Sequence, residues 1–548
     1  MKRREFIRLS ATASALGLIP SEVGAALKLA NTAFNCDVSN RKLVLIELRG
    51  GNDGLNTIIP YDNYGYYKET LRADIHIPVT SSNYNALKVD GQLSGTNQDL
   101  VFNPALLTGA NNGFKGLYQS GNLRLIQSVG YPAQNRSHFA SIDLWATGND
   151  GNSWDNGNTS GWMGRFMENA YADLLPSNYP FAIQLGSNNN WLGFHAEHEH
   201  GLDLNIDGQN SENFYSVLSG LAGQAPSVFP NSHFGEELRY ITDTDAFANT
   251  YANAIETSFN NGTNLNNAAD YPDTDLANQL KTVARLIRGG IDTKIYMVTI
   301  GGFDTHNEQN QAANDINGTH TELLNELSGA VDAFVQDINS DSIGDDIVGL
   351  TFSEFGRKAK QNGNLGTDHG QIAPMFVFGN SVNGGVSGVN VDLNEATAAN
   401  RWQFETVQHD YRQVFGTLLQ DFLGADNTVL DKTFFDHTNT ASFADATMDE
   451  IIQHEHKACA SLSINAVQSP TRWVIYPNPA NNFVHVRSIF DEEGAPYKIY
   501  NTSGALVKSG HIDVEAGKTS VLVSDLASGI YIFEIGEGKT IERKKLIV

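Results

Sequence analysis

The residues best suited to chemistry in this chain are acids and histidines placed beside glycine-rich turns. The clearest example is Gly366-Thr367-Asp368-His369-Gly370, in which an acid and an imidazole stand side by side between glycines. Carboxylate oxygen and neutral imidazole nitrogen are both good ligands for zinc and its neighbours in the first transition row. Because Asp-His-Gly also occurs in ordinary turns, the prediction of a metal site depends on similar stretches elsewhere in the chain.

Two such stretches lie upstream, each after an apolar run. In Arg49-Gly50-Gly51-Asn52-Asp53 the acid either caps a helix or binds a metal ion, and Arg49 would contact an anion. In the second, Asp304 and His306 follow Gly301-Gly302-Phe303. Residues two apart in extended backbone point to the same side, so we expect both to reach one ion. The alternative is a glycine turn that carries a histidine by chance.

A serine stands where a helix is expected to begin. Residues 140–147 have a helical pattern, and Arg136-Ser137-His138 precede them. Ser137 is either a simple N-cap or a nucleophile, because a helix N-terminus and nearby metal ions favour an alkoxide and an incoming anion. We expect Arg136 and His138 to face the same site.

Three further groups of polar residues carry alternatives. Glu354 and Arg357 follow a strand and form either a structural salt bridge or a substrate contact. His409 and Asp410 open a helix, where the acid is either a cap or a ligand that completes a second metal site. His195 to His200 alternate with glutamates, which is typical of a solvated loop but would also suit a metal-binding module.

The elements that must position these residues are buried strands and amphipathic helices. Near-continuous apolar runs predict parallel strands covered on both faces, and glycine-rich turns at their carboxyl ends are where open α/β sheets bind ligands. Two helices show a clear apolar face. We expect strands at 42–48, 123–129, 294–300, 346–352 and 374–378, helices at 276–287 and 322–338, and a loop-rich insertion over about 148–271 that shapes a substrate entrance.

Composition limits the function classes. The 548 residues include 36 basic and 62 acidic side chains, giving a net charge of −26. This charge repels nucleic acid and anionic lipid, and a site for an anionic substrate would need local positive charge. The hydrophobic content of 41% excludes global disorder.

The two ends of the chain have the features of targeting segments. Residues 1–26 have a basic head and a short apolar centre, too short to span a membrane, and Arg3-Arg4 resembles a twin-arginine export signal. Cys36 and Cys459 bracket the body, so a single disulfide outside the cytoplasm is one alternative. Residues 470–548 have short alternating strands separated by glycine-containing turns, which predicts a small antiparallel β-sandwich.

That C-terminal segment resembles a type IX secretion system sorting domain. The resemblance rests on 476–480, 525–531 and the final 544–548. It implies passage through the periplasm and across an outer membrane, with release or attachment at the cell surface.

The body, within 40–460, resembles the family called domain of unknown function 1501. The stretches that carry the resemblance are 49–54, 136–139, 302–306, 353–357 and 366–370. The family resembles a branch of the alkaline phosphatase and sulfatase superfamily, which implies a doubly wound, mostly parallel sheet flanked by helices, and two divalent metal ions, with zinc expected. By that resemblance Asp53, Asp368 and His369 would hold one ion, and Asp304 and His306 the other, completed by His409 or Asp410.

These observations lead to competing hypotheses. The first is an exported metal-dependent hydrolase of phosphate or sulfate esters, in which Ser137 attacks and Arg49, Arg136 and His138 contribute to the site; its substrate would be a small ester or a sulfated or phosphorylated glycan. The second is a surface binding or display protein that keeps the fold without turnover. The metal-binding module at His195–His200 is a third. The expected protein partners are the twin-arginine and type IX export machineries. A nucleic-acid partner and a transmembrane segment are not expected.

Overall fold

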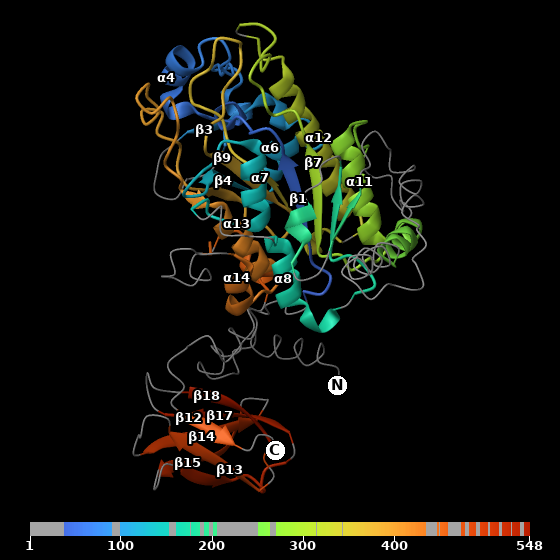
Figure 1. Cartoon of the computed structure of the whole chain (residues 1–548), viewed down its shortest axis with the longest axis vertical. Coiled ribbons are helices and arrows are strands. Elements are labelled where there is room, and N and C mark those ends of the chain that lie inside the picture. Colours follow the sequence, from blue (N-terminus) through green and yellow to red (C-terminus); the bar gives the residue numbers. More distant parts are fainter. Residues whose placement is uncertain are drawn as a thin grey trace, which may run out of the picture. The chain divides into compact units, whose positions relative to one another are not determined.

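The computed structural model contains two compact units, residues 1–460 and 461–548, and each is described by itself (Figure 1). The described residues are 38–89, 99–152, 160–175, 177–186, 191–196, 201–204, 250–262, 270–313, 315–341, 343–434, 447–448, 450–458, 473–476, 480, 482–488, 494–501, 505–513, 518–527, 529–536 and 542–548. The expected export signal at 1–26, both cysteines and residues 197–200 lie outside these ranges.

The larger unit is built on one mixed sheet. Its strands follow the order β10-β4-β9-β8-β1-β7-β5-β6, and β11 pairs with β4. All pairs are parallel except those that β9 makes with β4 and β8. The strands are β1 (Lys42–Leu48), β4 (Leu123–Gly130), β5 (Ala182–Leu185), β6 (Gly201–Leu204), β7 (Ile295–Ile300), β8 (Ile347–Phe352), β9 (Ala373–Phe378), β10 (Gly385–Ser387) and β11 (His409–Asp410).

Helices cover both faces of this sheet because its strands are apolar on both sides. Val44, Ile46 and Leu48 of β1 belong to the core beneath one set of helices, and Leu43 and Leu45 belong to the core on the opposite face. The first set is α6 (Gly113–Gln119), α11 (Asp275–Arg288) and α12 (Thr319–Asn339), and the second is α7 (His138–Thr147), α8 (Trp162–Ala170), α13 (Tyr411–Thr417) and α14 (Asn427–Thr433). The predicted α/β class, with a mostly parallel sheet between helices, is confirmed.

A third, smaller core stands apart from the main sheet. It packs Leu55, Tyr67 and Val101 against Ile372 and Phe404. Short elements contribute to this region: α3 (Gly54–Thr57), β2 (Ile58–Pro60), α4 (Tyr64–Tyr66), α5 (Tyr84–Leu87) and β3 (Leu100–Phe102). β2 and β3 form their own antiparallel pair.

The reversed direction of β9 determines where the key loop lies. Parallel strands place their carboxyl ends at one edge of a sheet. Because β9 is antiparallel to both neighbours, its first residue lies at that same edge. The segment 353–372 therefore leaves and re-enters the sheet on one side, beside the ends of β1, β4 and β7.

The smaller unit consists of antiparallel strands in two sheets, as predicted. One sheet has the order β12-β13-β16 and the other β15-β14-β17-β18, and alternating side chains such as Val484, Ile499 and Phe533 form their common core. The strands are β12 (Trp473–Tyr476), β13 (Phe483–Ser488), β14 (Gly494–Asn501), β15 (Leu506–Asp513), β16 (Lys518–Leu522), β17 (Ile530–Ile535) and β18 (Glu542–Ile547). Across the described residues of both units, no helix has the length and apolar character needed to cross a bilayer.

Candidate metal centre and active site

Three histidines and one aspartate converge at the carboxyl edge of the main sheet. His138 is the first residue of α7, after β4; Asp304 and His306 follow β7; and His369 precedes β9. Among the described residues, His138, Asp304 and His369 form a group whose ligand atoms all lie within 4.8 Å of one another. His306 adjoins it, with its Nε2 atom 2.9 Å from His369 Nε2 and 3.2 Å from Asp304 Oδ1.

The spacing of these atoms fits a small metal ion. His369 Nε2 lies 3.1 Å from both His138 Nε2 and Asp304 Oδ1, and His138 Nε2 lies 3.5 Å from Asp304 Oδ2. Zinc binds nitrogen and oxygen at about 2.0–2.1 Å in a tetrahedron, so its ligand atoms are about 3.3 Å apart. The observed separations bracket that value.

The outer nitrogen of each imidazole faces an acceptor. His138 Nδ1 lies 2.7 Å from Glu354 Oε1, and His369 Nδ1 lies 2.9 Å from the Arg136 carbonyl oxygen. His306 Nδ1 is 3.5 Å from Asp368 Oδ1. Because carboxylates and carbonyls only accept hydrogen bonds, a proton on Nδ1 satisfies these contacts and leaves the lone pair of the ring on Nε2. This is the arrangement that orients metal-binding histidines.

Electrostatics keeps these groups in the form that binds cations. Partial burial lowers the pKa of His369, so the ring is neutral near pH 7. Burial alone would raise the pKa of Asp304, but the hydrogen bond and charge of Arg357 outweigh burial and lower it. Lone pairs and a carboxylate that face one another at about 3 Å repel unless a proton or cation lies between them.

Arg357 holds the loops at this edge of the sheet together. Its buried guanidinium donates to the carbonyl oxygens of Gly51 at 2.8 Å, Thr367 at 3.0 Å and Phe303 at 2.9 Å, and it forms an ion pair with Asp304 at 2.5 Å. Glu354 accepts from the Gly50 backbone N–H at 2.9 Å while its other contact orients His138. Of the two alternatives for these residues, the structure shows the structural contacts; Glu354 and Arg357 are not paired with each other.

Ser137 lies next to the cluster as the N-cap of α7. Its side chain makes no capping hydrogen bond, and its backbone N–H donates to Asn135 Oδ1 at 2.8 Å. Ser137 and Arg136 are exposed. Within the described part of the chain the Ser137 hydroxyl therefore has no capping hydrogen bond, and it stands one residue before His138 of the cluster.

Arg49 follows β1 at the same edge. Its side chain is half-buried, and no hydrogen bond or ion pair joins its guanidinium to any other residue in the described part of the chain. Its neighbour Gly50 contacts Glu354. The positive charge of Arg49 acts on Glu47 of the same strand region, where it opposes the rise in the pKa of Glu47.

Asp53 lies apart from the cluster, in a buried ion pair. Arg72 binds both of its carboxylate oxygens, at 2.5 and 2.8 Å, and Gln309 Nε2 donates to one of them at 2.5 Å. Neither Asp53 nor Arg72 is exposed. Burial would raise the pKa of Asp53, but the charge of Arg72 outweighs it and lowers that pKa. Asp53 occupies the N-cap position of α3 without a capping bond.

This pair gives a prediction about stability. Removing one partner of a buried ion pair costs about 3–5 kcal/mol because the other charge is left unpaired. Arg72→Met should therefore lower the free energy of unfolding in urea by about that amount, with metal content unchanged. The exposed Lys432→Met on α14 serves as the control and should change little. Loss of metal without loss of stability would instead identify Asp53 as a ligand.

The remaining predicted ligands occupy different positions. Asp368 lies behind His306 and pairs with Lys358 Nζ at 3.0 Å, so it supports the cluster from outside. Asp410 caps α13 through a capping box and pairs with Arg412 at 2.7 Å, which matches the capping alternative. His409 lies on β11 beside Val129 of β4, and its Nε2 atom is buried without a hydrogen bond. Neither joins a group of metal-binding side chains among the described residues.

The sequence did not indicate two of these roles. His138 was predicted to face the site without a metal-binding role, and Glu354 was not linked to it, because the pair is 216 residues apart. The available signal was a histidine at a helix start after a buried strand. Of the histidines and glutamates in the His195–His200 stretch, only His195 falls within the described residues.

Beneath the cluster, Glu47 of β1 gives a prediction about pH. Burial, with a contribution from nearby Glu354, raises the pKa of Glu47 to about 7. The protonated form is thus favoured in the folded state, so the stability linked to it is complete below pH 4.5 and is lost as pH rises to about 7. Glu47→Gln should match the parent near pH 4.5 and exceed its free energy of unfolding at pH 8 by up to about 3 kcal/mol. If Glu47→Gln and the parent had equal free energies of unfolding at both pH values, this prediction would be contradicted.

Two family models match the chain. One, described as a protein of unknown function (DUF1501), matches residues 236–429, a range that contains Asp304, His306 and His369 but not Ser137 or His138. The other, described as a secretion system C-terminal sorting domain, matches residues 474–548. Both agree with the families that the motifs indicated, and the second indicates export to the cell surface or extracellular space. No curated protein matches the chain.

Several solved structures resemble the chain with low sequence identity and low TM-scores. A protein in the alkaline phosphatase superfamily from Vibrio parahaemolyticus is 9% identical, with a TM-score of 0.28 and coverage of 88% of this chain and 82% of that one. The lipoteichoic acid synthase of Listeria monocytogenes is 10% identical, with a TM-score of 0.27 and coverage of 86% and 88%. The alkaline phosphatase of the Antarctic bacterium TAB5 is 10% identical, with a TM-score of 0.25 and coverage of 62% and 92%.

Proposed function

We propose that this chain is an exported, metal-dependent hydrolase of phosphate or sulfate esters. The observation that carries the proposal is the convergence of Nε2 atoms from His138, His306 and His369 on the Asp304 carboxylate. A protein that only displayed a surface would have no need to hold mutually repelling groups at this spacing.

The donor set favours zinc. Imidazole nitrogen and carboxylate oxygen at these separations suit zinc, with related transition metals as competitors. His138, Asp304, His306 and His369 would hold one ion, rather than the two that the sequence suggested. When bound, such an ion supplies a Lewis acid that neutralises negative charge on the oxygens of the ester.

The residues of the chain would perform the remaining steps. The Ser137 hydroxyl attacks the phosphorus or sulfur atom, and its proton passes to the alcohol that leaves. Water then cleaves the Ser137 ester. The N-terminus of α7 favours negative charge at this position, and Arg49 and Arg136 offer guanidinium groups to an anionic substrate that the overall charge of −26 repels.

A non-catalytic binding protein is the second candidate. It is favoured by the engagement of Asp53 with Arg72, which leaves fewer carboxylates at the edge than a two-metal hydrolase would use. On this alternative the metal centre would bind a ligand at the cell surface without turnover.

Hydrolysis by the purified full chain separates the two candidates. 4-Nitrophenyl phosphate, bis(4-nitrophenyl) phosphate and 4-nitrophenyl sulfate are tested on the zinc-loaded protein and after EDTA treatment. The hydrolase predicts turnover of at least one ester, loss of turnover with EDTA and recovery with added zinc. Bound zinc without turnover of any ester would favour the binding protein, and no bound zinc would reject both.

The route of export forms part of the proposal. The sorting-domain match at 474–548 implies a type IX machinery as a partner, and Arg3-Arg4 suggests prior passage through a twin-arginine machinery. Sulfated or phosphorylated glycans are the proposed natural substrates, because they are esters encountered outside the cell.

A further inference from the structure

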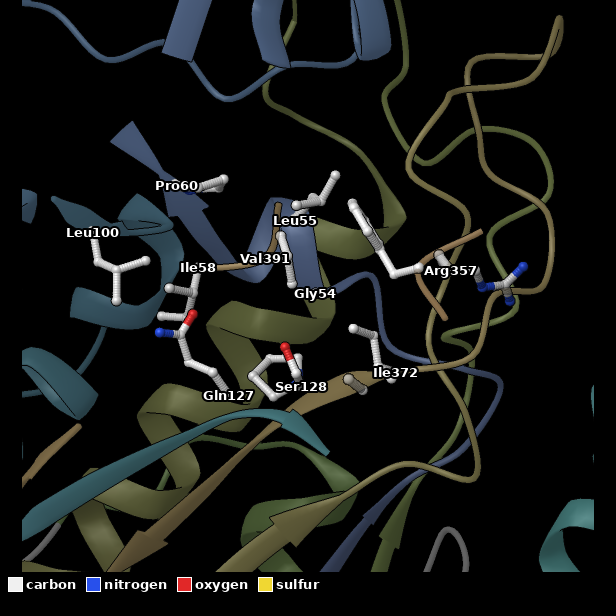
Figure 2. Close-up of a pocket in the computed structure, with 13 residues that line it drawn as sticks. Gly54, Leu55, Ile58, Pro60, Leu100, Gln127, Ser128, Arg357, Ile372 and Val391 are labelled. Carbon is white, nitrogen blue, oxygen red and sulfur yellow. The ribbon is translucent and has the colours of Figure 1, made fainter. Parts of the chain in front are cut away.

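A pocket distinct from the metal centre lies on the opposite side of Arg357. The empty space in and above this open hollow is about 450 Å³, a value that includes solvent outside it. Most of its walls are apolar, as Figure 2 shows. They include Leu55, Ile58, Leu100, Ile372, Val391 and Phe404.

Two polar residues, Gln127 and Ser128 of β4, also line this pocket. Neighbouring residues of a regular strand point to opposite faces, so a bulge is needed to bring both to one side. The pairing of β4 with β9 shifts register between Ile126 and Val129, and both of these residues pack in the same core although they are three apart. Ser128 is the extra residue, with φ of +53°.

This backbone conformation is uncommon for a residue with a side chain and marks a strained position. The strain places two buried polar groups, 6% and 4% exposed, in an otherwise apolar hollow. In Figure 2 the Gln127 amide and the Ser128 hydroxyl both lie on the floor of the pocket.

Hydrogen bonding leaves part of each group available. Ser128 Oγ accepts from Gln408 Nε2 at 2.9 Å, but no acceptor for its hydroxyl hydrogen occurs among the described residues. Gln127 Nε2 has only a long contact of 3.5 Å, to Asn390 Oδ1, and Gln127 Oε1 receives no donor there. The pocket therefore offers the Ser128 hydroxyl and the Gln127 Nε2 group as donors and Gln127 Oε1 as an acceptor, side by side.

The pocket offers no free charge. Arg357 contributes its aliphatic stem to the wall, and its guanidinium points away from the hollow (Figure 2). That guanidinium is already bound to Asp304 and to backbone carbonyls of the edge. An anion placed here would lose its hydration without gaining a cation.

We propose that this pocket binds a small neutral molecule with an apolar body and a single hydroxyl head. A hydroxyl both accepts and donates, so it satisfies Ser128 and Gln127 together, and the apolar body fills the remaining walls. A molecule with many hydroxyls, such as a sugar, would leave most of its polar groups unpaired against these walls. The site is separate from the proposed hydrolase chemistry and does not depend on it.

The test uses the full chain in EDTA, so that the metal centre plays no part. Calorimetric titration compares cyclohexylmethanol with cyclohexanecarboxylate, which has the same ring and a charged head. Saturable binding of the alcohol, at least tenfold tighter than that of the carboxylate, is expected. Equal binding of the two, or no saturable binding of the alcohol, would overturn the proposal.

Variants locate the site. Ser128→Gly removes the hydroxyl while glycine accepts the positive φ without strain, and it should weaken binding of the alcohol about tenfold. Asn112→Gly is the matched control, because Asn112 has a φ of +70° and does not line the pocket; its binding should equal that of the parent. Val391→Phe fills the pocket and should abolish binding. Unchanged binding in Ser128→Gly and Val391→Phe would show that the alcohol binds elsewhere.

Discussion

Replacement of His369 by alanine is expected to lower zinc affinity by at least about 100-fold. His369 Nε2 is the common neighbour of His138, His306 and Asp304, so its loss opens the centre of the donor set. Changes one layer further out already cost 10–100-fold in metal proteins, and removal of a ligand should cost more. Metal content by mass spectrometry and competition with a chromophoric chelator measure the effect.

Two further variants make this result specific. Glu354→Gln keeps the shape of the side chain that orients His138 but removes its charge, so affinity should fall about tenfold. His485→Ala removes a half-buried histidine of the smaller unit that contacts Ser520, and zinc binding should stay at the parental level. If His369→Ala retained full zinc affinity, the prediction that zinc binds at this cluster would be contradicted.

Replacement of Ser137 by alanine should reduce kcat for the hydrolysed ester by about 1,000-fold or more. Loss of the attacking group in a covalent mechanism removes a step that the rest of the site cannot supply, and comparable substitutions cost up to about a million-fold. Because the Ser137 side chain makes no capping bond, the fold should be unaffected. Steady-state kinetics and zinc content are measured on the same preparation.

Ser82→Ala provides the control for this variant. Ser82 is exposed and its hydroxyl contacts only Thr80 nearby, so activity should not change. A Ser137→Ala protein that keeps its zinc and its kcat would show that water attacks the ester directly. The metal centre would then remain as the catalytic feature and Ser137 would be only a helix start.

The sequence was sufficient for those parts of the fold that follow from local pattern. Apolar runs placed β1 and β7 to within a residue, and glycine-rich turns marked the edge where Asp304 and His369 meet. The position of Asp53 could not be inferred in the same way, because its partner Arg72 lies 19 residues away. Arg72 pairs with Asp53 and lies in an irregular region that has no periodic pattern of apolar residues. Nothing near Asp53 in the sequence indicates a buried arginine.

The strained Ser128 was equally hidden from sequence reasoning. A bulge is a property of the pairing between β4 and β9, and the run from Leu123 to Val129 has the pattern of an uninterrupted strand. Likewise, an antiparallel strand within a parallel sheet has the same apolar character as its neighbours, so the direction of β9 could not be inferred.

The path of the chain from β8 to β9 has a consequence for how new chemistry could arise here. Glu354, Arg357, Asp368 and His369 all belong to one uninterrupted excursion that starts and finishes on the same rim. Substitutions within this segment therefore fall outside the paired strands of β8 and β9. Of the four clustered side chains the segment supplies His369, while its Glu354 and Asp368 contact His138 and His306 from outside.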